Sequence, residues 1–531
     1  MQPAPTPAAI DRTEGLSDAA RRLLAEATAA LQRRDPPAFA RTATALRALA
    51  PKHPETLRLL AALARLQGRP GEAIDLLHEA ALARPGDTLV LSNLAQALAA
   101  AGATTQAATL LRRCVELEPT QEGHGLALAA LFERANDFEA AVEVLEGLLE
   151  RDPTRVATRI ALARALFALG RGEHAAAQYR QVLAIAPGAA AAWYGLSTLR
   201  SPPFDTADAD AIERLLARGE LDTAARASLG FALARAHEVL QRPDEAWNAL
   251  VAANAAWRRQ QSWDGPKMSL HLREIRAAFA AAEGSDDAGR GAGLVFIVGL
   301  PRSGSSVVEQ VLAAHPEVAA GGELEHVPAI LRGESARRRR DFPHWVPQAT
   351  AADWRRLGDA YLGGVRARRG EQRVFTDKGL LNWIYLGALR RMLPGARFVD
   401  CRRDPLETCL ACYRQMFAQA LGFTYELAEL ARFWHDYDAT MRHWHGLHAP
   451  ALLELHHEAL VAEPAREIRR LLDFCGLPFD EACLRAHEAP RGVRTLSAHQ
   501  LREPLRPRPP RASFYGNRLD GLRTLLATEP A

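Results

Sequence analysis

The first half of the chain repeats itself with a period of 34 residues. Three kinds of residue recur at this spacing: prolines at Pro51, Pro85, Pro119, Pro153 and Pro187, small turn formers at Gly68, Gly102, Asn136 and Gly170, and alanines at Ala73, Ala107, Ala141 and Ala175. Glycine and asparagine accept the left-handed backbone that ends a helix, proline stops a helix, and the small side chain of alanine lets two helices approach closely. These markers predict a unit of two helices joined by a tight turn, and their repetition predicts a stack of such units.

The repeating unit resembles the tetratricopeptide repeat, a helix–turn–helix of 34 residues. The resemblance covers residues 17–200, and the degenerate first unit keeps the register through Arg34, Phe39 and Pro51. An array of this kind can bind a peptide or protein partner, or it can simply support a second domain. The sequence leaves both interpretations open.

Composition suggests further boundaries along the chain. Residues 1–16 are expected to be disordered. Residues 201–282 read as a helical connector in which the stretch 227–256 looks like one more repeat. A linker rich in glycine and aspartate follows at 283–293, and glycine-rich stretches of this kind separate folded segments. A second domain is therefore expected over residues 294–531.

In this second domain short apolar runs alternate with helical patterns. The runs that predict strands are Leu294–Val298, Val374–Thr376, Arg397–Cys401 and Leu452–Leu455, with a shorter segment at Glu317–Ala320. The helical patterns cover Ser305–Ala314, Trp383–Met392, Leu406–Gln419 and Ala465–Cys475. Alternation of strands and helices predicts an α/β domain with a central parallel sheet. The whole chain is thus expected to be multidomain, with an all-α solenoid followed by an α/β domain.

A loop typical of anion binding follows the first predicted strand. Gly299 and Gly304 have the G-x-x-x-x-G spacing of a phosphate-binding loop, and a helical pattern begins directly after them. Ser305 stands where a nucleotide triphosphatase has its lysine, and that lysine is needed to reach the β- and γ-phosphates. The loop therefore predicts a bound anion at a helix start and argues against a nucleotide kinase.

Other polar residues follow the neighbouring strands. In parallel sheets, ligands bind beyond the carboxyl ends of the strands. The residues at those ends are Arg302–Ser306, Gly321, Gly322, Glu323, Asp377, Lys378, Arg402 and Arg403. Backbone amides, arginines and a lysine suit a ligand with several anionic groups. Lys378 stands out because the chain has only two other lysines, Lys52 and Lys267.

Residues from about 290 onward resemble the sulfotransferases that use 3′-phosphoadenosine 5′-phosphosulfate. Their phosphosulfate loop matches Pro301–Ser306, and their R-R-D-P-L-x-T-C segment matches Arg402–Cys409. The Asp-Lys pair of Thr376–Lys378 and the late segment Val493–Gln500 also match. The resemblance is greatest to bacterial proteins that join tetratricopeptide repeats to a P-loop-like sulfotransferase domain similar to tyrosylprotein sulfotransferases.

The resemblance implies a role for each matching residue. Glu323 would be the general base, although Glu325 is an alternative, and Lys378 and Ser497 would balance charge on the transferring group. The residues expected to bind the donor are Arg302, Ser303, Gly304, Ser305, Ser306, Arg403, Thr408 and Arg511. Arg302 is also counted among the catalytic residues, and Arg403 would contact the 3′-phosphate. The implied reaction moves a sulfuryl group to a hydroxyl or phenol, leaves adenosine 3′,5′-bisphosphate, and needs no metal.

The chain departs from the family pattern at three places. Ala411 stands eight residues after Arg403, where relatives usually have a serine for the 3′-phosphate, so Thr408 or Cys412 is the candidate substitute. Gly379–Asn382 replaces the usual residues after the lysine. The loop Arg506–Gly516 is proline-rich and lacks the expected G-R-W, which leaves Arg508, Arg511 and Ser513 as candidates there. Ala411 and the altered C-terminal loop motivate an alternative function, a repeat-based binding scaffold with an impaired sulfotransferase domain.

Composition narrows the partners and the location. A net charge of +3 gives no overall attraction to nucleic acid, and no apolar run is long enough to span a membrane. The first residues show no secretory signal, and six scattered cysteines read as reduced thiols, so a cytoplasmic location is expected. Cys409 and Cys412 form a lone C-x-x-C that favours packing over metal binding. The expected partners are a peptide or protein at the repeats and a small-molecule or protein acceptor.

Overall fold

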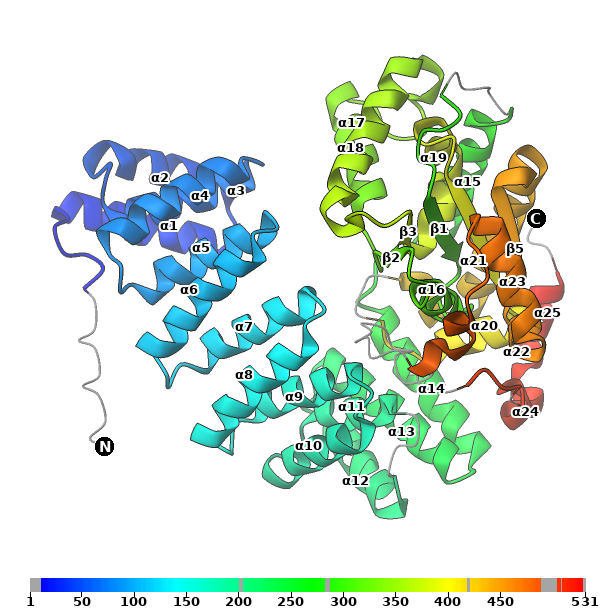
Figure 1. Ribbon diagram of the computed structural model, residues 1–531. Helices are drawn as coiled ribbons and strands as arrows, with labels where there is room; N and C mark the ends of the chain where they lie inside the picture. The colour runs from blue at the N-terminus through cyan, green and yellow to red at the C-terminus, as the bar shows by residue number, and fades with distance from the viewer. Residues whose placement is uncertain are drawn as a thin grey trace. The chain divides into compact units, whose positions relative to one another are not determined.

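The computed structural model describes residues 11–199, 204–281, 287–417, 421–488, 504–507 and 509–528. Within these residues the chain divides into two compact units, the first ending at Ala186 and the second starting at Pro187 (Figure 1). The first unit is made of helices, and the second combines helices with a parallel sheet. This confirms the predicted architecture of a helical repeat array followed by an α/β domain.

The first unit is a succession of antiparallel helix pairs. Its helices are α1 (Asp18–Gln32), α2 (Pro36–Leu49), α3 (Pro54–Leu66), α4 (Pro70–Ala83), α5 (Thr88–Ala100), α6 (Thr104–Leu117), α7 (Glu122–Arg134), α8 (Phe138–Arg151), α9 (Val156–Ala168) and α10 (Gly172–Ile185). The first helices of successive pairs start 34 residues apart, at Pro54, Thr88, Glu122 and Val156. The period in the sequence is therefore the period of the structure.

The repeated residues do what their chemistry predicts. Gly68, Gly102, Asn136 and Gly170 have φ angles of 72°, 84°, 60° and 77°, so each ends its helix in the left-handed region. Arg34, between α1 and α2 of the first repeat, adopts the same conformation, with φ of 56°. The four repeated alanines are completely buried between helices. A larger side chain there would force the helices of a pair apart.

The predicted disorder of residues 1–16 falls mostly on residues 1–10, which lie outside the described residues. Residues 11–16 are ordered, and Arg12 pairs with the buried carboxylate of Asp87 at 3.2 Å. Composition places a domain boundary at 283–293, whereas the compact units divide at Ala186. The predicted domain ranges stay a prediction on this point.

Five helices open the second unit and pack against the α/β part that follows them. They are α11 (Ala190–Thr198), α12 (Thr206–Ala217), α13 (Thr223–Val239), α14 (Pro243–Arg258) and α15 (Gly265–Ala278). Arg258 on α14 donates two hydrogen bonds, of 2.7 and 2.6 Å, to the carboxylate of Glu429. Ser269 on α15 donates to Asp436 at 2.6 Å. Polar contacts thus join this helical segment to the α/β part, which explains why the two form one compact unit.

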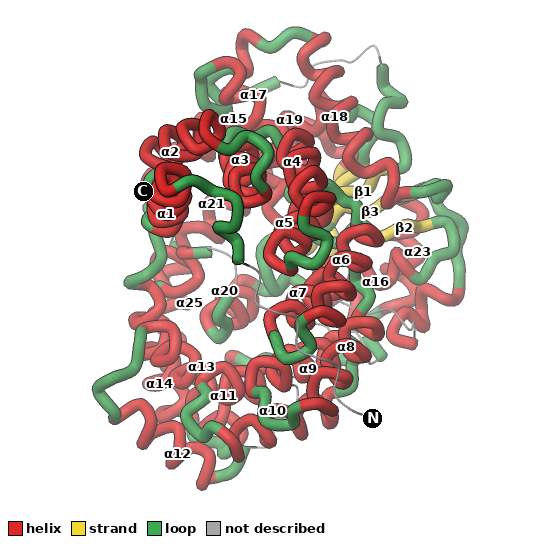
Figure 2. Tube along the Cα trace, turned by 90° about the vertical axis from the view of Figure 1, so that its left-hand side faces the viewer, coloured by secondary structure: helices red, strands yellow, loops and turns green. Residues whose placement is uncertain are grey.

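The described residues of the second unit contain a five-stranded sheet. Its strands are β1 (Leu294–Gly299), β2 (Val318–Ala320), β3 (Val374–Asp377), β4 (Arg397–Arg402) and β5 (Leu452–His456). The spatial order is β2-β3-β1-β4-β5, and every neighbouring pair is parallel. In Figure 2 the strands, drawn in yellow, form a small sheet in a chain that is otherwise mostly helical. All five predicted strands are confirmed.

The helices of this part lie between and after the strands. They are α16 (Ser305–Ala313), α17 (His326–Arg338), α18 (Ala351–Arg369), α19 (Leu386–Met392), α20 (Pro405–Tyr413), α21 (Leu427–His448), α22 (His457–Ala462), α23 (Pro464–Cys475), α24 (Ala512–Tyr515) and α25 (Asp520–Ala527). The predicted helix 383–392 is α-helical only from Leu386, after a 3₁₀ segment at Leu380–Tyr385. The predicted helix 406–419 ends at Tyr413, and residues 418–420 lie outside the described residues.

Alternate residues of the central strand face different layers of helices. Val295 and Ile297 belong to a core formed with α16, α22 and α23. Phe296 points to the opposite face, where it packs against Phe398 of β4 and Tyr361 of α18 with ring centroids 5.2 and 5.5 Å apart. Both faces of the sheet are therefore covered, as a parallel sheet requires. Within the described residues, no helix is both long and apolar enough to cross a membrane.

Candidate functional site

The loop after β1 has the backbone of an anion-binding turn. Arg302 and Gly304 have φ angles of 70° and 96°, and α16 starts directly after them at Ser305. A Cβ atom at Gly304 would lie 2.7 Å from Nδ1 of His457, so both conformation and space require glycine there. The first amides of α16 have no partner within the helix, which makes its start a favourable place for an anion. The Oγ atom of Ser303 is buried and finds no hydrogen-bond partner among the described residues.

Positive charge is concentrated around Arg302. Burial lowers the pKa of its guanidinium, and the charges of Arg403 and Arg414 lower it further, while Cys412 acts in the opposite sense. Nη1 of Arg403 donates a hydrogen bond of 3.4 Å to the backbone oxygen of Arg302. Crowded guanidinium groups repel one another, so an anion bound between them would relieve a real electrostatic cost.

Arg403 and Thr408 flank a pocket at the carboxyl ends of β4 and β5. Arg403 pairs with Glu407 at 3.1 Å, and the hydroxyl of the buried Thr408 donates to the backbone oxygen of Arg403 at 3.4 Å. The pocket has a volume of about 340 Å³. The residues that line it include three that were predicted to bind the sulfuryl donor, namely Ser303, Arg403 and Thr408. Three side chains with rings also line it, namely Trp434, Tyr437 and His456. It offers charged side chains of both signs, since Asp404 and Glu458 also line it, together with aromatic rings next to the loop.

Glu323 and Lys378 meet at the end of β3. Nζ of Lys378 donates to Oε1 of Glu323 at 2.7 Å. The lysine side chain is 2% exposed, whereas the glutamate side chain is 49% exposed. A molecule arriving from solvent can therefore reach the carboxylate of Glu323, whereas the ammonium group of Lys378 is buried. The structure selects Glu323 over Glu325 as the partner of Lys378, and Glu325 starts α17 instead.

The turn that carries Glu323 is held close to β3. Gly321 donates to the backbone oxygen of Thr376 at 2.8 Å, and a Cβ atom at Gly321 would lie 2.6 Å from that oxygen. The amide of Gly322 donates to the carboxylate of Glu309 on α16 at 2.9 Å. Glu309 thus ties the helix of the anion loop to the turn of the candidate base. No pattern in the sequence marks this role, because the glutamate lies in the middle of an ordinary helical pattern.

Asp377 precedes Lys378 and is buried. Its carboxylate accepts hydrogen bonds from the hydroxyl of Tyr361 at 2.7 Å and from the amide of Gly379 at 2.8 Å. Burial nevertheless raises the pKa of Asp377 to about 7, and the nearby Glu309 raises it further. These contacts orient the segment from which Lys378 projects.

This raised pKa predicts how stability varies with pH. The pKa in the fold lies above the value of about 3.9 in an unfolded chain, so the folded state binds the proton more tightly. The contribution of the protonated Asp377 to the free energy of unfolding is complete below pH 4. It is lost as the pH rises toward 7. An Asp377→Asn variant should lack this dependence, which we expect to be on the order of a few kcal/mol. Urea unfolding at pH 5 and pH 8 measures it, and an equal pH response in both proteins would contradict the prediction.

The C-terminal residues reach back to the same region. The amide of Ala512 donates to Glu407 at 2.7 Å, on the carboxylate that also pairs with Arg403. The guanidinium of Arg511 lies 3.8 Å from the carboxylate of Glu238 and is 46% exposed. Arg511 therefore lies near Arg414, which pairs with the same carboxylate. Ser497 and Arg508 lie outside the described residues, and their predicted roles stay predictions.

The sheet order explains how the predicted residues converge. β1 lies between β3 and β4, so its loop is flanked by Lys378 on one side and by Arg403 on the other. The structure gathers the loop Arg302–Ser306, Glu323, Lys378, Arg403 and Thr408 at one edge of the sheet. Sequence inspection missed Glu238, Glu309, Glu407 and Arg414, whose partners are set by the fold.

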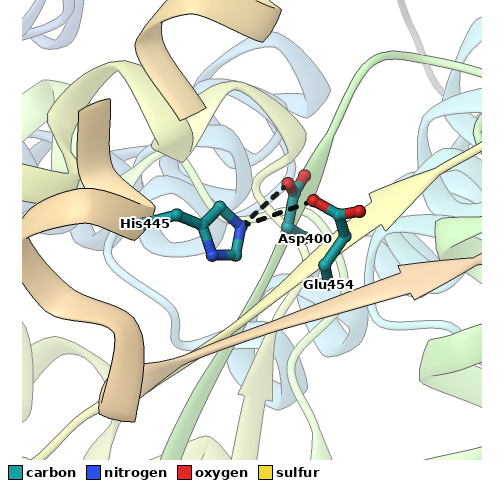
Figure 3. A group of neighbouring side chains, drawn as sticks. All are labelled: Asp400, His445 and Glu454. Atoms are coloured by element: carbon teal, nitrogen blue, oxygen red, sulfur yellow. Dashed lines mark hydrogen bonds and ion pairs between the residues drawn. The ribbon is translucent and has the colours of Figure 1, made fainter. Parts of the chain in front are cut away.

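A second charged cluster lies beneath this edge. Asp400, His445 and Glu454 come from three elements and point toward one another (Figure 3), with candidate ligand atoms within 4.8 Å. The guanidinium of Arg402 already contacts Asp400 at 2.9 Å and Glu454 at 3.2 Å. Burial alone would raise the pKa of Asp400, but the hydrogen bond from His445 and the charge of Arg402 hold it below its ordinary value. The cluster is a compensated ion network that fixes the end of β4.

The two cysteines of the C-x-x-C are also structural in these surroundings. Both are free and buried, and burial raises the pKa of Cys412 to about 12. The thiol of Cys412 donates to the backbone oxygen of Pro301 at 3.2 Å. It therefore packs α20 against the anion loop.

Comparison with known proteins shows which families match parts of the chain. Residues 295–481 match the sequence model of the sulfotransferase family, and residues 64–131 and 134–199 match that of the tetratricopeptide repeat. The C-terminal part of the chain is therefore a sulfotransferase-family domain, and tetratricopeptide repeats precede it. Both resemblances predicted from the sequence are confirmed.

Individual relatives match parts of the chain. An uncharacterized protein of Aquifex aeolicus is 27% identical over 407 residues, covering 74% of this chain and 53% of that protein. Protein-tyrosine sulfotransferase 1 of Danio rerio is 26% identical over 203 residues, covering 37% of this chain and 56% of that protein. The chain thus spans about half the length of each. The sulfotransferase domain of the olefin synthase of Synechococcus PCC 7002 is 20% identical, with a TM-score of 0.31, over 47% of this chain and 99% of that domain.

Proposed function

We propose that this chain transfers a sulfuryl group from 3′-phosphoadenosine 5′-phosphosulfate to a hydroxyl or phenol, such as the tyrosine of a peptide or protein. The observation that carries the proposal is the contact of 2.7 Å between Lys378 and Glu323 at the same end of the sheet as the anion loop. A loop without the kinase lysine, a buried cation and a solvent-facing carboxylate suit sulfuryl transfer better than phosphoryl transfer. The relatives named as protein-tyrosine sulfotransferases support a phenolic acceptor.

The residues at the sheet edge fit such a donor. Arg302, Arg403 and Arg414 carry three positive charges against the carboxylates of Glu238 and Glu407. A ligand with a 5′-phosphosulfate and a 3′-phosphate carries several negative charges, which suit binding by guanidinium groups. Arg302 and the loop amides would hold the first group, and Arg403, Thr408 and Arg511 would hold the second. The pocket at the ends of β4 and β5 has room beside them for part of the nucleoside.

The chain's own side chains then perform acid–base and electrostatic work. When bound, the donor presents an electrophilic sulfur attached to a phosphate leaving group. Glu323 accepts the proton of the acceptor hydroxyl as its oxygen forms a bond to sulfur. Lys378 stabilises the negative charge that builds on the bridging oxygen as the old sulfur–oxygen bond breaks. Adenosine 3′,5′-bisphosphate is the product that departs.

We propose that the repeats recruit a peptide or protein. We also propose that the chain works in the cytoplasm with its thiols reduced. A second function, a repeat-based binding scaffold with an impaired sulfotransferase domain, rests on two features. Ala411 stands where relatives usually have a serine for the 3′-phosphate, and the C-terminal loop departs from the family pattern. Two measurements separate the functions. An active enzyme should bind adenosine 3′,5′-bisphosphate in calorimetry and transfer labelled sulfate to acceptors. Absence of both in folded protein would favour the scaffold.

Restoring the serine tests whether Ala411 is a defect. Ala411 is half-buried on α20, the helix that follows Arg403. An Ala411→Ser variant should bind adenosine 3′,5′-bisphosphate more tightly, by about tenfold or more, because one hydrogen bond to a charged group is gained. Calorimetry measures this, with Ala411→Val as a control that adds bulk but no hydroxyl. Equal affinity in the serine variant and the wild type would show that the missing hydroxyl is not limiting.

A further inference from the structure

Glu238 is a buried acid from the helical segment that precedes the sulfotransferase-family match. It lies near the end of α13, and its side chain is 2% exposed. Arg414 donates to both of its oxygens through Nε and Nη2, and Arg235 pairs with it at 2.6 Å. The hydroxyl of Tyr515 donates to it as well. Burial opposes ionisation, but the charge of Arg414 lowers the pKa of Glu238 to about 2, so the carboxylate stays charged.

Its main partner, Arg414, is next to the anion loop. Arg414 directly follows α20, the helix whose Cys412 contacts Pro301 and which begins just after Arg403. The charge of Arg414 is close enough to lower the pKa of Arg302. Repulsion from Arg302 and Arg403 would push a free guanidinium away from this place. A carboxylate that grips it through two nitrogens holds it there.

The same carboxylate fixes the C-terminal residues. Tyr515, whose hydroxyl donates to Glu238, belongs to α24. This helix begins at Ala512, whose amide donates to Glu407, the partner of Arg403. Glu238 and Glu407 therefore clamp α24 from two sides and hold Arg511 at the edge of the cluster. Three stretches that are far apart in the chain, namely α13, the end of α20 and α24, meet at one buried acid.

We propose that Glu238 is a positioning residue for the donor site, which places Arg414 and α24 so that the anionic donor binds beside Arg302. The inference rests on the proposed function and adds that the donor site is incomplete without the helical segment before the sulfotransferase-family match. Glu238 does not touch the reacting atoms. It acts on donor binding through Arg414.

The test is calorimetry of the full chain with adenosine 3′,5′-bisphosphate. Glu238→Gln should weaken binding about tenfold or more, since a charge-assisted pair is lost. Arg414→Gln should have a similar effect, and the double variant should lose little beyond either single one. Arg414→Lys keeps a positive charge beside the carboxylate of Glu238 but cannot form the bidentate pair. It should also weaken binding, and it serves if Glu238→Gln fails to fold.

Glu429→Gln is the matched control. Its pair with Arg258 joins the same helical segment to α21, and both side chains are partly exposed. Binding should stay within twofold in this variant. In sulfate transfer, Glu238→Gln should raise the KM for the donor and leave the KM for the acceptor unchanged.

The outcomes separate the two proposals. Absence of binding by the wild type would overturn the proposed function and this inference with it. Wild-type binding that is matched or exceeded by Glu238→Gln and Arg414→Lys would overturn the inference alone. An equal loss in Glu429→Gln would also overturn it, because the effect would then come from general loosening of the helical segment.

Discussion

A Glu323→Gln variant is expected to lose about three orders of magnitude in kcat while it still binds adenosine 3′,5′-bisphosphate. A positioned general base contributes about 10²–10⁴-fold to a reaction. The amide keeps the size of the side chain and a hydrogen bond to Lys378, but it cannot take the acceptor proton. Loss of the counter-charge of the buried Lys378 should lower stability, and the retained hydrogen bond limits that loss. Transfer of labelled sulfate measures kcat, and calorimetry measures binding.

Glu325→Gln provides the matched control for this loss. Glu325 is an exposed carboxylate only two residues further along the same turn, and its replacement should leave kcat within about twofold. A reversal, in which Glu325→Gln is inactive and Glu323→Gln is active, would assign the base to Glu325. Full activity in both variants would reject a glutamate base on this turn.

A Lys378→Met variant is expected to lower kcat about a hundredfold to a thousandfold. Removal of one preorganised group that stabilises transition-state charge costs about this much in other enzymes. The ammonium group is buried, so its charge acts in a medium where electrostatic interactions are strong. Methionine is similar in length and suits the buried position. The loss should appear in kcat more than in the donor KM, because the charge it balances develops during the reaction.

Lys267→Met is the control for this substitution. Lys267 is an exposed lysine on α15, so its replacement should change neither kcat nor stability. Lys378→Arg should restore little activity, since a planar guanidinium does not fit the place of a compact ammonium group. Turnover by Lys378→Met at the wild-type rate would remove the lysine from the mechanism.

Local patterns in the sequence predicted the elements well. The period of 34 gave the helix starts from Pro54 to Val156, and the left-handed turn residues were found where glycine or asparagine recurs. The strands followed from short apolar runs, and the loop Arg302–Ser306 followed from its glycine spacing. These features depend on neighbouring residues, because helix ends and strand burial are decided within one or two turns of chain. The predicted helix 406–419 was too long, because no local signal marks its end at Tyr413.

Contacts between distant parts of the chain had to come from the fold. Lys378 and Glu323 are 55 residues apart, and a motif could suggest both residues but not that one is buried and the other open to solvent. Arg414 and Glu238 are 176 residues apart, and no motif marked either of them.

The sequence by itself determined a repeat array, a parallel sheet and an anion loop, since periodicity and turn chemistry are written in adjacent residues. Only the tertiary structure decided which charges are paired, which are buried, and that α13 reaches the candidate donor site. The physical reason is that electrostatic partners and burial depend on the distance between atoms in space, which separation along the chain does not report.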